Sequence, residues 1–251
     1  LFSKKYLNNL TSLFYLFYPS LILYTSVSLR DILVCSTTIM SSIMFLRKKY
    51  ISSILFGVLA LLIKPSLFIF IALILIFYFL LIETLLNQKK SLPLLISSII
   101  SLLVFLIFGD SMFNYANFYR EAFYWDAGIS KSEMPFIKDK YHMIFHIFKN
   151  SLTGFTKPGL FEVTNIFQLF QAVENMILIG FLIIIFKNLY IKSKSKFYYW
   201  LFSLLLLIGI FNTIVPNEGT YVRYKFSIIM TFVTIITFEI TALRNSKYEK
   251  K

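Results

Sequence analysis

The stretch that decides the fold class is residues 66–82, SLFIFIALILIFYFLLI, which holds 17 consecutive residues without a charge. In a helix this run extends about 25 Å at 1.5 Å per residue, close to the roughly 30 Å hydrocarbon core of a bilayer. Seven more apolar runs accompany it, at residues 10–28, 32–46, 51–63, 92–108, 174–190, 197–215 and 226–243. The sequence therefore predicts an all-α fold, a polytopic transmembrane helical bundle of about eight spans.

Composition excludes several other classes of protein. Of the 251 residues 58% are hydrophobic and only 15% are charged, against roughly 25% charged residues in soluble domains. The 29 Phe and 16 Tyr exclude a disordered chain. One Cys and two His cannot form a disulfide framework or a structural zinc site. We expect no metal site and no cofactor. A divalent cation that binds mainly to phosphate groups of a ligand is not excluded, because it needs only one or two carboxylates from the protein.

The basic residues behind the net charge of +13 lie mainly in the connections between the apolar runs. With the N-terminus in the cytoplasm, the inner connections carry 15 basic and two acidic residues, whereas the outer ones carry 10 basic and nine acidic. This asymmetry is the positive-inside rule. We therefore expect one membrane domain over residues 1–251, with both termini cytoplasmic, the bilayer as its surroundings and no nucleic-acid partner.

Lys64-Pro65 separates two of the shorter runs. A single helix over residues 51–82 would extend about 48 Å, well beyond the bilayer core. Proline also disfavours helical backbone at the residue before it, so we expect a break here. No removable signal peptide is visible, and we expect further residues to precede Leu1.

One long polar connection, residues 109–175, is predicted on the outer side. Its length favours internal structure: an aromatic helix at 114–125, an amphipathic helix at about 138–150, a turn at Pro158-Gly159, and a helix at 163–173 leading into the next span. His142 and His146 have the spacing of paired zinc ligands, but without a third ligand we interpret them as ordinary helix residues.

Ionisable residues beside the outer ends of the spans are the candidate site. Arg and Lys there can hold a phosphate or diphosphate, and a carboxylate beside them could deprotonate a sugar hydroxyl. The alternative is that adjacent opposite charges simply form polar turns. The predicted catalytic residues are Asp31 and Glu162, and the predicted substrate-binding residues are Arg30, Lys64, Lys157, Glu174, Arg223 and Tyr224.

Short motifs at these positions resemble a known group of proteins. They are Tyr18-Pro-Ser20, Ser28-Leu-Arg-Asp31, Gly57 to Lys64-Pro65, Lys157-Pro-Gly-Leu-Phe-Glu162, Glu174-Asn175 and Glu218-Gly-Thr-Tyr-Val-Arg-Tyr224. Together they resemble the O-antigen or capsule repeat-unit polymerases of bacteria and related GT-C glycosyltransferases that use lipid-linked sugars. No acidic residue precedes Asp31, where GT-C enzymes usually carry a catalytic acidic pair.

The resemblance implies a GT-C-like fold and transfer of a glycan from undecaprenyl diphosphate at the outer face of the bacterial inner membrane. It also implies contact with a chain-length regulator or other polysaccharide-assembly proteins. Two alternatives remain. A flippase for the same lipid-linked glycan would show two related halves and mid-membrane charges, and a non-catalytic scaffold would need only helix and lipid contacts.

Overall fold

The computed structural model describes residues 29–80, 109–111, 113–125, 137–159, 161, 163, 166–215 and 218–248. Nearly all of these residues are helical, and no strand occurs among them, so the all-α prediction is confirmed for this part of the chain. The predicted spans at 10–28 and 92–108, and Glu162, lie outside the described residues.

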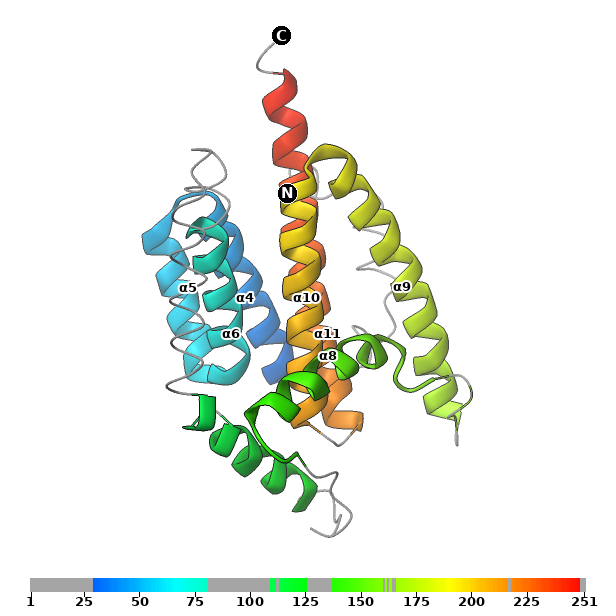
Figure 1. Ribbon diagram of the computed structural model, residues 1–251. Helices are drawn as coiled ribbons and strands as arrows, with labels where there is room; N and C mark the ends of the chain where they lie inside the picture. Colours follow the sequence, from blue (N-terminus) through cyan, green and yellow to red (C-terminus); the bar gives the residue numbers. More distant parts are fainter. Residues whose placement is uncertain are drawn as a thin grey trace. The chain divides into compact units, whose positions relative to one another are not determined.

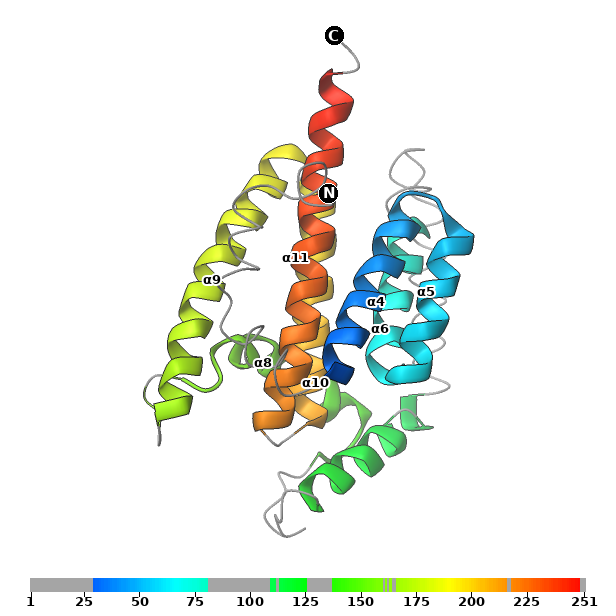
Figure 2. The same cartoon turned by 180° about the vertical axis from the view of Figure 1, so that it is seen from behind.

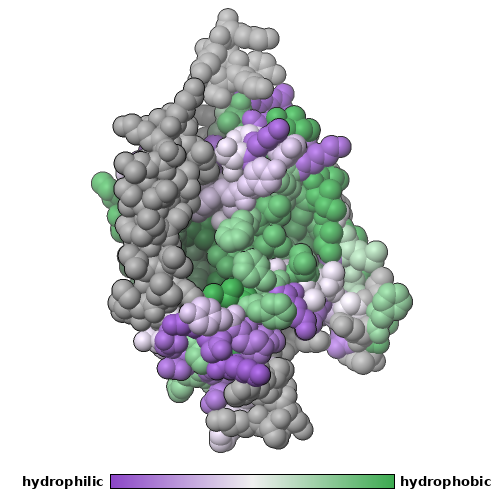
Figure 3. Space-filling view, in the orientation of Figure 1, coloured by the Kyte–Doolittle hydropathy of each residue, from purple (hydrophilic) through white to green (hydrophobic). Residues whose placement is uncertain are grey.

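Three helices are long and apolar enough to cross a membrane. The qualifying segments are Gln168–Lys192 within α9 (Ile166–Lys192), Lys194–Ile214 of α10 (Lys194–Ile214) and Thr220–Arg244 within α11 (Glu218–Tyr248). The visible surface of α9 and α10 is largely hydrophobic along the helices and hydrophilic where they join (Figure 3). These helices mark a membrane protein, while the count of eight spans stays a prediction.

Two shorter apolar helices meet at the predicted break. α5 (Tyr50–Ile63) and α6 (Pro65–Tyr78) have 14 residues each, about 21 Å of helix. Lys64 between them has φ −155° and ψ 85°, outside the helical region. The break at Lys64-Pro65 is thus confirmed, as expected for a residue that precedes proline.

The chain divides into two compact units. Unit 1 covers residues 1–75, 156–204 and 223–251, and unit 2 covers residues 76–155 and 205–222. α10 and α11 each contribute to both units. The prediction of one membrane domain stays a prediction.

Within unit 1, α4 (Leu29–Leu46), α5 and α6 lie side by side (Figures 1 and 2). Ser41 Oγ donates to the carbonyl of Ser53 at 2.8 Å, and Ser53 Oγ donates to the carbonyl of Ser41 at 2.9 Å. Gly57 permits the close approach, because a Cβ there would lie 2.7 Å from Phe68 Cζ. Small residues thus let these helices pack closely.

α6 and α11 also pack against α10 in unit 1. Tyr199 on α10 donates its hydroxyl to the carbonyl of Ile74 on α6. Trp200 is fully buried, with its ring centroid 5.9 Å from that of Phe232 on α11. Aromatic side chains therefore take part in this core beside the aliphatic ones.

Cations from several elements gather around the later part of α11 in unit 1. Lys196 forms an ion pair with Glu239, and Lys192 Nζ donates to the carbonyl of Ile240 at 2.9 Å. Arg47, just after α4, lies over the ring of Phe238 at 5.8 Å. This end carries the residues that the positive-inside rule assigns to the cytoplasm.

Unit 2 contains the helices predicted within the long connection. Residues 113–125 are helical, and α8 extends over Lys140–Thr156, so both predicted helices are confirmed. Asp139 caps α8, because its Oδ1 accepts hydrogen bonds from the backbone N–H groups of Tyr141 and His142 at 2.9 and 2.8 Å. The helix expected at 163–173 begins at Ile166 and continues unbroken as α9.

Candidate functional site

The candidate site lies in unit 1 around the corner between α5 and α6. Pro65 has no N–H to complete the ladder of α5 and instead begins α6. The last carbonyl groups of α5 therefore need partners from elsewhere. Arg30, in the first turn of α4, supplies one, because its Nε and Nη2 donate to the carbonyl of Ile63 at 3.2 and 2.8 Å.

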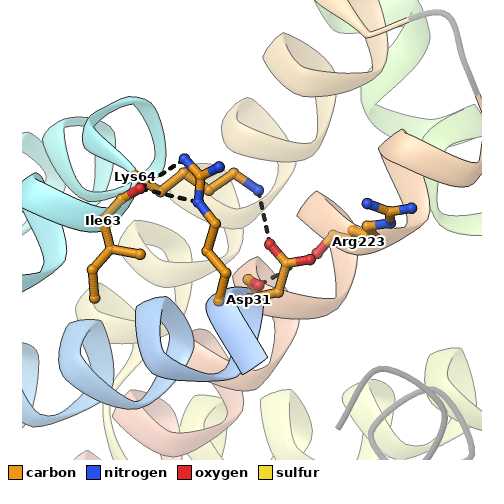
Figure 4. A network of polar contacts seen from close by, with 6 residues as sticks. Asp31, Ile63, Lys64 and Arg223 are labelled. Carbon is orange, nitrogen blue, oxygen red and sulfur yellow. Dashed lines mark hydrogen bonds and ion pairs between the residues drawn. The ribbon is translucent and has the colours of Figure 1, made fainter. Parts of the chain in front are cut away.

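Asp31 and Lys64 connect the same two elements. Lys64 Nζ lies 3.2 Å from Asp31 Oδ1, and the side chains are 16% and 8% exposed. Asp31 is also in the first turn of α4, where the helix dipole favours a negative charge. Figure 4 shows this ion pair beside the hydrogen bonds to Ile63.

Tyr224 brings α11 to this corner. Lys64 Nζ lies 3.7 Å from the centroid of the Tyr224 ring, within the range of a cation–π interaction. Four of the residues predicted from sequence, Arg30, Asp31, Lys64 and Tyr224, thus lie together on three elements. Their roles in binding and catalysis stay predictions.

Arg223 is arranged differently from its neighbour Tyr224. Its side chain is exposed, and in Figure 4 its guanidinium points away from the Asp31–Lys64 pair. It makes no hydrogen bond or ion pair through its side chain with any residue the structure describes.

Lys225 is the centre of a second, buried polar group. Its Nζ donates to the carbonyl of Lys157 and to Asn175 Oδ1, both at 2.8 Å. Asn175 Nδ2 donates to the same Lys157 carbonyl at 2.9 Å. Glu174 adds a negative charge close to the ammonium. Lys225 is only 2% exposed, and such a buried charge is tolerated because it is paired and hydrogen-bonded.

This second group changes the interpretation of two predicted residues. Lys157 enters it through its main-chain carbonyl, and Glu174 is buried at the contact of α9 with α11. Lys225 and Asn175 were missed as site residues. The signal for Lys225 was present, because a charge directly before the apolar run 226–243 needs buried partners.

The first turns of α11 therefore point three successive side chains in three directions. Successive residues on a helix are about 100° apart. Tyr224 contacts the α5–α6 corner, Lys225 contacts α9 and the turn at Lys157, and Arg223 is free of both. Structural contacts thus fix α11 on two sides and leave one arginine exposed on a third.

The two histidines with the spacing of zinc ligands both lie on α8. His142 and His146 have ring centroids 4.6 Å apart in an edge-to-face arrangement, and His142 Nδ1 accepts a hydrogen bond from the backbone N–H of Lys138 at 3.1 Å. Within the described ranges, no group of three or more His, Cys, Asp or Glu side chains is placed to hold a metal ion.

Comparisons of the chain with models of protein families, with curated proteins and with solved structures returned no match.

Proposed function

We propose that this chain is a membrane glycosyltransferase of surface polysaccharide biosynthesis, and specifically an O-antigen or capsule repeat-unit polymerase. It would act on undecaprenyl-diphosphate-linked glycans at the outer face of the bacterial inner membrane. The multi-pass topology of about eight spans and the GT-C-like architecture belong to the same proposal, as does contact with other polysaccharide-assembly proteins.

The observation that carries the proposal is the arrangement of charges around the α5–α6 corner. Lys64 pairs with the carboxylate of Asp31, Arg30 donates to the neighbouring carbonyl of Ile63, and Arg223 stands exposed on the first turns of α11, so the group has more cations than carboxylates. Lys192 and Lys196 contact the later part of α11, at Ile240 and Glu239, whereas the first turns of α11 reach the corner through Tyr224. The positive-inside rule would then place the corner on the outer side.

In this proposal the cations bind the carrier and the carboxylate moves a proton. Arg223 and Arg30 hold the diphosphate, since guanidinium groups pair with phosphate oxygens through two hydrogen bonds. Asp31 accepts the proton of the acceptor hydroxyl as its oxygen bonds to the anomeric carbon. The bond from that carbon to the diphosphate breaks, and undecaprenyl diphosphate leaves.

The test is complementation of a gene deletion in the host. Arg223→Ala should abolish long polysaccharide while leaving one repeat unit attached and the protein level unchanged, because its side chain supports no described contact. Arg244→Ala is the matched control, since this exposed arginine lies towards the other end of α11. A normal chain-length ladder in Arg223→Ala and in Arg30→Ala would contradict the proposed site.

A second candidate, a flippase for the same lipid-linked glycan, is favoured by one observation. Lys225 and Glu174 are ionisable groups buried among helices that are apolar enough to span the membrane, and such groups mark transport pathways in many carriers. The deletion separates the two functions. Loss of the polymerase leaves core with a single repeat unit, whereas loss of a flippase removes even the first repeat.

A further inference from the structure

One face of α8 packs closely on α10 within unit 2. A Cβ at Gly209 would lie 2.3 Å from the carbonyl oxygen of Ile147. Asn150 Nδ2 donates to Thr213 Oγ1, and Asn212 Nδ2 donates to the carbonyl of Asn150, both at 3.0 Å. α8 is thus anchored through its backbone as well as its side chains.

These contacts fix the depth of α8 along α10. The helix α10 qualifies as a membrane span over Lys194–Ile214. Gly209 lies five residues before its end, about 7.5 Å along the axis. With Lys194–Ile214 across a bilayer, α8 would therefore cross α10 within about 7.5 Å of the level where the hydrocarbon core meets the headgroups.

The face of α8 that points away from α10 is apolar and exposed. Its members follow a spacing of four, three and four residues, which places them on one stripe of a helix. They are Tyr141, Phe145, Phe148 and Leu152, exposed by 59%, 63%, 56% and 69%. Lys149, His142 and Thr153 lie on the flank beside this stripe.

We propose that α8 is an interfacial membrane helix whose Tyr141, Phe145, Phe148 and Leu152 stripe is covered by the lipids of the bilayer. Lipid is the expected neighbour because α8 packs near the end of a membrane-spanning helix. At that level the side chains of α8 that point away from α10 would meet the bilayer. Exposed Lys138 and Lys149 complement anionic headgroups. This inference requires only that α10 spans a membrane and is independent of the glycosyltransferase proposal.

A second helix of unit 2 has the same character. On residues 113–125, Tyr115, Phe118 and Trp125 are exposed by 65%, 68% and 84%. Tyr and Trp favour the membrane–water interface because their rings are apolar at one end and polar at the other. Two helices of one unit thus present aromatic faces suited to the same environment.

Spin labelling of the full-length chain tests the proposal in liposomes of phosphatidylethanolamine and phosphatidylglycerol. Single cysteines are introduced from 144 to 153 in a Cys35→Ala background, which removes the natural thiol. The collision rates of each label with oxygen, which concentrates in lipid, and with a water-soluble nickel chelate are then measured. For Phe148→Cys the oxygen-to-nickel ratio should be several-fold higher than for Lys149→Cys, its matched control.

Across the scan, the ratio should oscillate with the period of a helix and peak at positions 145, 148 and 152. If one substitution prevents folding, the other two peak positions still decide. Equal ratios at Phe148→Cys and Lys149→Cys would overturn the proposal. Protection of the stripe from both reagents would also overturn it, and dipolar broadening would then identify a second copy of the chain as the occupant.

Discussion

Replacing Gly209 with alanine tests the packing of α8 on α10 most directly. The new Cβ would lie 2.3 Å from the carbonyl oxygen of Ile147 and 3.1 Å from Ser151 Cβ. Non-bonded carbon and oxygen atoms rarely approach closer than about 3.3 Å, so α8 would have to move by about 1 Å. Because the obstacle is backbone, no change of rotamer relieves the contact.

The size of the effect follows from two opposing contributions. Inserting a methyl group into a packed interior typically costs about 1–3 kcal/mol, whereas alanine is favoured over glycine in a helix by about 1 kcal/mol. We therefore expect Gly209→Ala to lower the free energy of unfolding by up to about 2 kcal/mol. If α8 did not pack here, the packing cost would be absent and the substitution would raise the free energy of unfolding through helix propensity alone.

Gly180 in α9 provides the matched control, because a Cβ there meets no atom within 4 Å. Gly180→Ala should leave stability unchanged or raise it by at most about 1 kcal/mol. Both variants are compared with the unmodified protein by thermal unfolding in one detergent. A midpoint for Gly209→Ala at or above that of Gly180→Ala would refute the close packing of α8 on α10.

Three further predictions concern ionisable side chains. Lys225→Met removes the donor to Asn175 Oδ1 and should destabilise the protein by roughly 1–3 kcal/mol; an unchanged unfolding midpoint would contradict this network. Lys196→Met removes the ion-pair partner seen for the buried carboxylate of Glu239 and should cost about 3 kcal/mol, and adding Glu239→Gln should recover much of that loss in a double-mutant cycle. Burial, and then neighbouring positive charges, lower the pKa of His146, so the unfolded chain binds that proton more tightly and stability falls as the pH drops below about 6.5. His146→Gln should flatten the dependence of the unfolding midpoint on pH between about 7 and 5, and an identical slope in both proteins would count against the shift.

The sequence predicts the break between α5 and α6 well. Proline lacks an N–H and constrains the residue before it, so the corner at Lys64-Pro65 follows from local chemistry. α8 was expected to end near residue 150, but it continues to Thr156, where the turn at Pro158 follows. Local signals thus locate helix ends to within about two turns.

Neighbours around the bundle could not be predicted in the same way. Hydropathy gives the depth of a residue but not the direction in which its side chain points. Arg30, Asp31 and Lys64 are expected at a common depth, whereas the contact of Arg30 with Ile63 and that of Asp31 with Lys64 appear only in the structure. The contact of Lys225 with Asn175 joins residues 50 positions apart, and no local pattern encodes it.

The three directions of Arg223, Tyr224 and Lys225 restrict how unit 1 can change shape. α11 cannot turn about its own axis without breaking the cation–π contact of Tyr224 on one side and the hydrogen bonds of Lys225 on another. A one-residue insertion just before Arg223 would rotate the start of α11 by about 100° relative to its later turns. Any functional motion of α11 that keeps these contacts must therefore carry α9 and the α5–α6 corner along as a single rigid body, with Arg223 travelling on its surface.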